Sequence, residues 1–167
     1  MAIFTVIVVK SGENLRKGAA VSKRFRGNYT HTIDGKGRII VPAKFRELLG
    51  DRCLLTIGQE ECIAMYTEED FDALMDKLEE TPTFSDEALR RLKRNIFSNT
   101  DDQEFDKQGR IMIAPYLRDA AGIALGEDVC VRGMGTHIEI WNPEKWAKYN
   151  EDFEFGRSGA ALAPYNL

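Results

Sequence analysis

One motif occurs twice in this chain, and this repeat constrains the fold more than any other feature. The sequence DGKGRIIVPAKFR at residues 34–46 recurs as DKQGRIMIAPYLR at residues 106–118, 72 residues further along the chain. A second pair of blocks, CIAMYTEEDF at 62–71 and HIEIWNPEKW at 137–146, follows in the same order. Two matched blocks in one order indicate an internal duplication of one small unit, and such a duplication decides the architecture.

The copies have the same series of strand and turn signals. Alternation of side chains before the first turn is typical of a strand, whose residues point to opposite faces in turn. The turns combine Asp, which can bond its own downstream backbone, with Gly, which accepts positive φ. The expected strands are 29–33, 38–41, 53–57 and 62–66 in the first copy, and 110–113 in the second.

Short helices follow these strands. Pro42 stands at a favourable first helical position and Gly50 follows the last helical residue, which predicts a helix between them. Pro115 and Gly122 predict the equivalent helix in the second copy. Later helices are expected after the cap Thr67, over residues 68–78 with Phe71, Leu74, Met75 and Leu78 on one face, and at Asn142-Pro143.

A further helix is expected between the copies. Ser85 is its predicted N-cap, and an apolar stripe at helical spacing predicts that it packs on the rest of the fold. The stripe consists of Leu89, Leu92, Ile96 and Phe97, and the other faces carry Arg90, Arg91, Lys93 and Arg94. A connecting helix is the favoured interpretation, and direct contact of these cations with a nucleic acid is the alternative.

Each copy has about 50 residues, which is too few for a secure core of its own. The copies are therefore expected to pack on each other as a pseudo-dimer with their strands in one barrel-like core. The predicted fold class is a β-rich α+β protein built from two tandem β-α units.

Charge is distributed unevenly along the chain. The net charge of −4 argues against a generally basic binder of nucleic acid. Residues 26–47 nevertheless contain five basic and two acidic side chains, whereas residues 60–80 contain nine acidic and one basic. The chain can therefore carry a local positive surface despite its negative total, although ordinary solvated charge would give the same counts.

Several classes of protein are not indicated. No apolar run approaches the roughly 20 residues that cross a bilayer, and residues 1–9 lack the basic flank and cleavage site of a signal peptide. The cysteines are odd in number and widely spaced, which is typical of reduced, buried thiols in a cytoplasmic protein. They are Cys53, Cys62 and Cys130.

Catalysis is not indicated either. Of the two histidines, His31 stands in an expected strand and His137 stands near another. No nucleophile motif surrounds a Ser or Cys, no Gly-rich phosphate loop separates a strand from a helix, and no close-spaced residues suit a metal. The sequence therefore predicts no enzyme activity, cofactor, metal site or small-molecule substrate.

The paired Asp-x-x-x-Arg turns, each followed by an apolar strand and a Pro-led helix, resemble the MraZ family. The Arg26-Gly27 pair before the first strand adds to this resemblance, which covers residues 25–152. That family is similar to the AbrB/SpoVT group of swapped-hairpin DNA-binding domains. The resemblance implies a pseudo-dimeric double-split barrel with peripheral helices. It also implies a cytoplasmic, nucleoid-associated bacterial transcription regulator without a membrane segment.

The resemblance further implies a ring-shaped homo-oligomer that binds repeated promoter sites in double-stranded DNA upstream of the division and cell-wall gene cluster. Family members begin with Met before the Arg-Gly pair, where this chain has Phe25. Three explanations of this extension stay open: a start assigned too early, an added segment, or a basic arm. The expected divisions are an extension at 1–24, a first repeat at 25–80, a connecting helix at 81–98, a second repeat at 99–152 and a weakly ordered tail at 153–167.

The turns are the expected DNA-binding elements, because a two-stranded β element can enter the major groove and Arg can pair with guanine through two hydrogen bonds. The predicted DNA-contacting residues are Arg26, Lys36, Arg38, Lys107 and Arg110. The predicted turn-structuring residues are Asp34, Gly35, Gly37, Asp106 and Gly109.

Two points stay open from sequence. Each turn Arg could instead form only a salt bridge to its own Asp, and Arg46 and Arg118 suit salt bridges at the core edge as well as DNA. If one turn dominates DNA contact, the first, more basic turn is the expected one, and the second would then serve more in assembly. The alternative function is a protein-interaction or antitoxin-like module, in which the acidic stretch 60–80 binds a basic protein.

Overall fold

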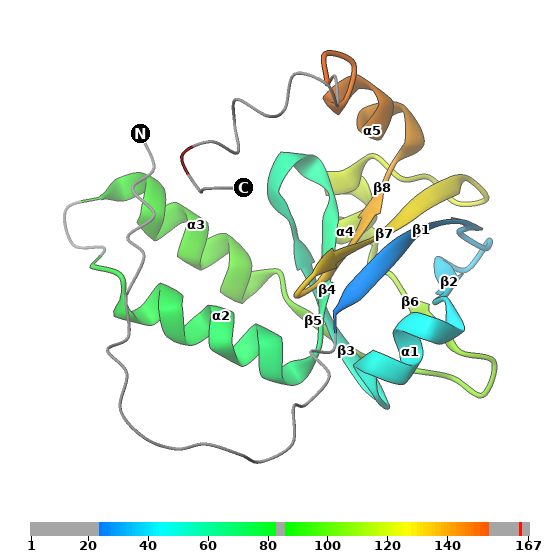
Figure 1. The fold of residues 1–167 in the computed structure, drawn as a ribbon, viewed down its shortest axis with the longest axis horizontal. Helices are drawn as coiled ribbons and strands as arrows, with labels where there is room; N and C mark the ends of the chain where they lie inside the picture. The colour runs from blue at the N-terminus through cyan, green and yellow to red at the C-terminus, as the bar shows by residue number, and fades with distance from the viewer. Residues whose placement is uncertain (1–23, 83–85, 154–163, 165–167) are drawn as a thin grey trace.

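The computed structural model describes residues 24–82, 86–153 and 164, and its elements follow the duplication (Figure 1). In the first repeat they are β1 (Phe25–Thr32), β2 (Arg38–Ile40), α1 (Ala43–Leu49), β3 (Arg52–Ile57), the 3-10 turn η1 (Gln59–Glu61), β4 (Ile63–Tyr66) and α2 (Glu68–Glu80). After α3 (Glu87–Ser98), the second repeat has β5 (Asp101–Glu104), β6 (Arg110–Met112), α4 (Pro115–Ala121), β7 (Asp128–Gly135), β8 (Ile138–Trp141) and α5 (Pro143–Tyr149). The fold is thus mixed α+β and dominated by strands, as predicted.

The strands form one antiparallel six-stranded sheet in the order β1-β7-β8-β4-β3-β5 and a separate two-stranded ribbon of β2 and β6. Four pairings join one repeat to the other. They are β1 with β7, β5 with β3, β4 with β8, and β2 with β6. Each repeat therefore supplies strands that the other repeat needs, which agrees with the predicted pseudo-dimer.

The ribbon has a symmetric register. Ile39 faces Ile111 at its centre, with Arg38 opposite Met112 on one side and Ile40 opposite Arg110 on the other. The same symmetry continues at the ribbon ends, where Val41 N donates to Gly109 O at 3.1 Å and Ile113 N donates to Gly37 O at 2.8 Å. The glycine of each turn thus accepts a hydrogen bond from the residue that follows the ribbon strand of the other repeat.

One hydrophobic core serves both repeats. Its members include Ile39 and Ile111 at the centre of the ribbon, together with Phe45 of α1 and Leu117 of α4. The Phe45 ring packs edge-on against Phe25 and Tyr29 of β1, with ring centroids 5.7 and 5.2 Å apart. Burial of such rings is among the largest stabilising contributions in a small domain, so the ribbon is anchored to the sheet through helices α1 and α4.

The local helix signals were largely accurate. Gly50 and Gly122 follow α1 and α4 with φ of 81° and 67°. Thr67 accepts a hydrogen bond from Asp70 N, and Asn142 accepts from two amides of α5. One detail was wrong, because Pro42 is the N-cap of α1 and the helix begins one residue later.

Helix α3 departs from its prediction. It exists, but none of its residues is buried, and Leu92 and Phe97 of the expected packing stripe are 43% and 47% exposed. The helix contacts the sheet at β3, and Leu89 and Ile96 of the stripe are half-buried. Its N-cap is Asp86, which accepts from Leu89 N. The predicted cap, Ser85, lies outside the described residues, as do nearly all of the expected extension and tail.

The cysteines are free, as expected. Cys53 and Cys62 are buried and Cys130 is half-buried. Burial raises the pKa of the Cys53 and Cys62 thiols to about 12, which keeps them protonated and unreactive. None of the described helices is both long and apolar enough to cross a membrane.

Candidate nucleic-acid interface

The first turn is organised around the carboxylate of Asp34. Its Oδ1 accepts hydrogen bonds from the backbone amides of Lys36 and Arg38, both at 2.9 Å, and its Oδ2 accepts from Arg38 Nε at 2.8 Å. The backbone closes the turn through Gly37 N to Asp34 O at 3.0 Å and Asp34 N to Arg38 O at 2.9 Å. One side chain thus fixes both the loop and the direction of the arginine.

The second turn repeats this geometry bond for bond. Asp106 Oδ1 accepts from the amides of Gln108 and Arg110 at 2.9 Å, and Oδ2 accepts from Arg110 Nε at 2.8 Å. Arg110 Nη2 also lies 2.8 Å from the same carboxylate oxygen. The side chains of Arg38 and Arg110 are similarly half-buried, at 27% and 24% exposed. The copies are therefore equivalent in turn geometry.

These hydrogen bonds favour the ionised carboxylates. Amide donation from Arg38 is the largest cause that lowers the pKa of Asp34, to about 2 from an ordinary 3.8. Amide donation from Arg110 lowers the pKa of Asp106 in the same way. Both carboxylates are therefore charged at neutral pH and partly offset the arginines that they hold.

The glycines of the turns have different roles. Gly37 and Gly109 are buried and have φ of 80° and 73°, a left-handed conformation that favours glycine. Gly35 does not have positive φ, and a Cβ there would meet nothing within 4 Å. Of the predicted turn-structuring glycines, Gly37 and Gly109 thus have positive φ, whereas Gly35 does not, and its equivalent in the second copy is Lys107.

Arg46 and Arg118 connect the repeats, a role that sequence alone left undecided. Arg46 Nε donates to Val41 O at 3.1 Å, and Arg118 Nε donates to Ile113 O at 3.3 Å. A Cβ on Gly109 would stand 2.5 Å from Arg46 Cζ, and one on Gly37 would stand 3.3 Å from Arg118 Nε. Each arginine therefore rests against the turn of the other repeat. The shared final arginine of the two motifs was the only sequence signal for this role.

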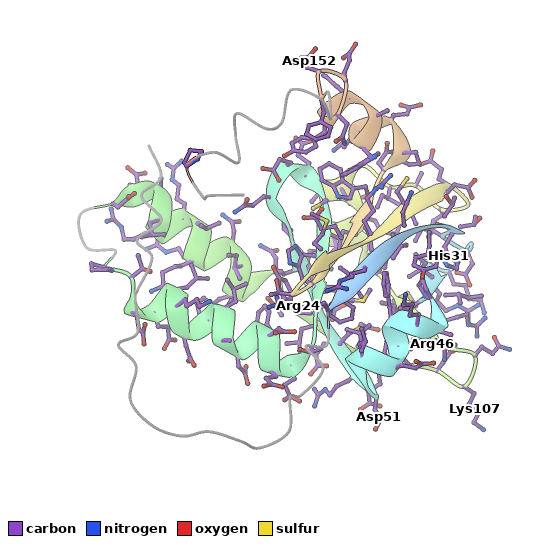
Figure 2. All side chains as sticks on the ribbon, viewed as in Figure 1. Arg24, His31, Arg46, Asp51, Lys107 and Asp152 are labelled. Carbon is purple, nitrogen blue, oxygen red and sulfur yellow. The ribbon has the colours of Figure 1, made fainter. Side chains whose placement is uncertain are left out.

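The expected contact residues do not all lie together. Lys36 and Lys107 are exposed on the two turns. Figure 2 places Lys107 and Arg46 on one side of the molecule, together with His31 near the ribbon end of β1. Arg26 is exposed at the other end of β1, opposite Met134 of β7. At about 3.3 Å per strand residue, it stands roughly 25 Å from the first turn, so it is not part of the same surface.

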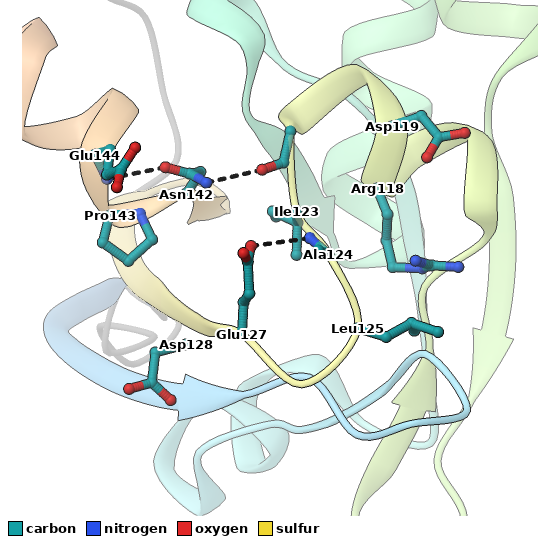
Figure 3. Close-up of a pocket in the computed structure, with 11 residues that line it drawn as sticks. Arg118, Asp119, Ile123, Ala124, Leu125, Glu127, Asp128, Asn142, Pro143 and Glu144 are labelled. Atoms are coloured by element: carbon teal, nitrogen blue, oxygen red, sulfur yellow. Dashed lines mark hydrogen bonds between the residues drawn. The ribbon is translucent and has the colours of Figure 1, made fainter.

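One surface pocket shows none of the usual catalytic side-chain combinations in its lining. This open pocket of about 960 Å³ lies beside α4 and the start of α5, with four carboxylates and Arg118 in its lining (Figure 3). Its lining contains no histidine, serine or cysteine. Asn142 Nδ2 donates a hydrogen bond to Gly122 O at 2.7 Å. This contact joins the start of α5 to the end of α4 and is structural.

The histidines likewise have structural neighbours. His137 stacks on Tyr66 with ring centroids 5.0 Å apart, and its Nε2 lies 3.4 Å from Glu139 Oε1. Desolvation lowers the pKa of His31. Within the described part of the chain, no group of three His, Cys, Asp or Glu side chains could hold a metal ion.

The fold and the paired turns define a class of protein: a duplicated α+β chain whose strands pair across the repeats and which displays two equivalent Asp-held arginines. A family model described as "MraZ protein, putative antitoxin-like" matches residues 24–95 and again residues 96–161. The chain belongs to the MraZ family.

Curated relatives support this assignment. "Transcriptional regulator MraZ" of Acetivibrio thermocellus is 42% identical over 128 residues, which is 77% of this chain and 87% of that protein. The protein of the same name from Desulfitobacterium hafniense is 41% identical over 143 residues, 86% of this chain and 98% of that protein. That of Alkaliphilus metalliredigens is 44% identical over 128 residues, 77% and 87% of the two chains. These names describe regulators, in agreement with the expectation that the chain is not an enzyme.

Among solved structures, a solution structure from Pyrococcus horikoshii covers 71% of this chain and 96% of its own, with a TM-score of 0.31 at 20% identity. Likeness at that level carries no argument about this fold.

Proposed function

We propose that this protein is a DNA-binding transcription regulator that contacts DNA through the β2–β6 ribbon and its two turns. The observation that supports this most is the duplicated arginine geometry, in which Asp34 and Asp106 hold Arg38 and Arg110 in the same way at the two turns. The ribbon therefore presents one oriented arginine at each end. The relatives' shared name, transcriptional regulator, agrees with it.

The shape and charge of the ribbon suit duplex DNA. The major groove admits a two-stranded β-ribbon, and both turns project exposed lysines beside the held arginines. A guanidinium has five N–H donors. Nε and Nη2 of Arg110 face Asp106, and the other Nη can still donate to a base or a phosphate. Orientation by the carboxylate reduces the conformational entropy that binding would cost.

The finer expectations belong to the same proposal. We propose that the protein is cytoplasmic and associates with the nucleoid. We also propose that it has the swapped-hairpin double-split barrel fold of AbrB/SpoVT domains, with repeats at 25–80 and 99–152. The cross-repeat strand pairing supports that class. One chain offers few cationic contacts, so a ring of copies on repeated promoter sites of the division and cell-wall cluster would raise avidity through effective concentration.

The test is footprinting and gel-shift titration on the DNA upstream of the chain's own gene. Arg38→Ala and Arg110→Ala should each abolish the shift while light scattering shows an unchanged oligomer. Arg91→Ala is the matched control, because it also removes one paired cation, from the highly exposed face of α3. Undiminished binding by both turn variants would overturn the proposal, and equal loss with Arg91→Ala would move DNA contact to α3. Protection at evenly spaced short repeats would support the ring.

An antitoxin-like or protein-binding module is the second candidate. The description of the matching family model includes the words antitoxin-like, and α2 begins with three acidic residues in its first turn. Capture of a protein partner that survives nuclease treatment, without any DNA shift, would favour this candidate.

A further inference from the structure

The outer face of the ribbon is not purely cationic. Side chains alternate along β2 and β6, so that Ile39 and Ile111 point into the core while their neighbours point outward. Ile40 is 49% exposed and Met112 is 41% exposed, although both stand in regular strands. The two arginines of the turns occupy the remaining outward positions of the same strands.

The register places apolar and cationic side chains in a checkerboard. Arg38 is directly opposite Met112, and Arg110 is directly opposite Ile40. Met112 also reaches the first turn, since its Sδ would lie 3.5 Å from a Cβ on Gly37. Each exposed apolar side chain therefore lies next to an arginine that an aspartate orients. A partner that contacts the apolar side chain must also contact the arginine.

That pattern restricts the partner. A second copy docked by this face would bring the arginines and turn lysines of both copies together, which like-charge repulsion opposes. The partner must instead combine negative charge with apolar groups about 5 Å from hydrogen-bond acceptors, the distance between paired residues in a ribbon. The major groove of duplex DNA presents these groups, because guanine offers acceptors, thymine offers a methyl group, and phosphates flank both.

We propose that Ile40 and Met112 pack against thymine methyl groups in the major groove and so determine sequence preference beside the bases read by Arg38 and Arg110. This rests on the proposed function and adds direct readout of thymine to it. Along β2 the arginine and isoleucine are two residues apart, roughly 7 Å. That distance is about two base-pair steps of 3.4 Å, so a thymine is expected about two steps from each contacted guanine.

The experiment removes the methyl groups while keeping base pairing. The region upstream of the chain's own gene is amplified with thymidine, deoxyuridine or 5-bromodeoxyuridine triphosphate, and the full chain is titrated by fluorescence anisotropy at fixed salt. Wild type should bind the uracil DNA more weakly, by about fourfold for each methyl group that Ile40 or Met112 contacts, the value of burying one such apolar group. Bromine, similar in size to a methyl group, should restore binding.

The matched variant is the double substitution Ile40→Ser, Met112→Ser, with Leu92→Ser on α3 as a control of similar exposure. The double variant should bind thymine DNA weakly and should not distinguish thymine from uracil. Leu92→Ser should behave as wild type. Circular dichroism and light scattering establish that each variant keeps its fold and its oligomer.

Two outcomes overturn the inference: equal binding of wild type to thymine and uracil DNA, or a double variant that still discriminates between them. Either leaves the proposed function standing, because duplex binding by wild type is measured in the same titration and its loss in Arg38→Ala is measured by gel shift. Absence of any binding by wild type to thymine DNA would instead overturn the proposed function. A change of oligomeric state in the double variant, with unchanged DNA affinity, would assign the apolar pair to self-association.

Discussion

Arg46 of the first repeat lies so close to Gly109 of the second that a Cβ on this glycine would stand 2.5 Å from Arg46 Cζ. The two residues are far apart in sequence, and they meet because β2 and β6 pair across the repeats. The guanidinium thus packs directly against Gly109 of the second turn, and it has room there because position 109 lacks a side chain.

The first prediction concerns this contact. Gly109→Ala should destabilise the protein by about 1–3 kcal/mol, because it combines left-handed backbone with a displaced arginine. Gly37→Ala should cost less, since the nearest atom would be 3.3 Å away. Gly35→Ala is the control and should stay within about 0.5 kcal/mol of wild type. Urea unfolding measures all three, and equal stability of the three variants would contradict the geometry.

The second prediction is a pH dependence of stability from Asp34. Its folded pKa of about 2 lies below the ordinary 3.8, so the ionised form is favoured in the folded state. The stabilisation is fully present above the unfolded value and is lost as the pH falls toward 2. Asp34→Asn should therefore unfold more easily than wild type at pH 6, and the difference should shrink between about pH 4 and pH 2.

Thermal unfolding of both proteins across that range is the measurement. Asn can still accept the amide hydrogen bonds through its oxygen, so the turn should persist. A difference in stability that stays constant down to pH 2 would show that the carboxylate charge contributes nothing.

The third prediction concerns the packing of α5. The guanidinium of Arg132 of β7 lies over the Trp146 ring, with Arg132 Cζ 3.7 Å from the ring centroid. Arg132 Nε is buried without a hydrogen-bond partner among the described residues. A double-mutant cycle of Arg132→Met and Trp146→Leu should give a coupling of about 0.5–2 kcal/mol. A second cycle, in which Tyr149→Leu takes the place of Trp146→Leu, should give a much smaller coupling energy. Similar coupling energies in the two cycles would exclude a specific cation–π contact.

The two turns could be predicted from sequence because their chemistry is local. Asp34 bonds amides two and four residues ahead, and Gly37 supplies the positive φ that closes the loop. Duplication of the motif then predicted the second turn. The helix ends at Gly50 and Gly122 are local in the same sense, since each depends on one glycine and the preceding turn of helix.

The partners of the strands could not be predicted in this way. Alternation shows that a strand has two faces, but it does not say which strand lies beside it. The pairing of β1 with β7, and the contact of Arg46 with the second turn, depend on how the repeats interlock. The burial predicted for the stripe of α3 failed for a related reason, because periodicity reveals an apolar face and not whether the fold covers it.

The last prediction separates the two roles that the sequence left open for Arg46. Its Nε donates to Val41 O, and its guanidinium lies against Gly109 of the second turn. Arg46→Met keeps the aliphatic stem but removes one half-buried hydrogen bond, so stability should fall by about 1 kcal/mol. If the charge beneath the turn also contributes to the DNA-facing potential, affinity should fall and the slope of log affinity against log salt should decrease by about one. Arg46→Lys should restore the salt slope but not the stability, because a lysine keeps the charge but lacks the planar guanidinium.

Anisotropy titrations over a range of salt concentrations, with unfolding curves for both variants, measure these effects. Lost stability with an unchanged salt slope in Arg46→Met would assign the residue to support of the turn alone.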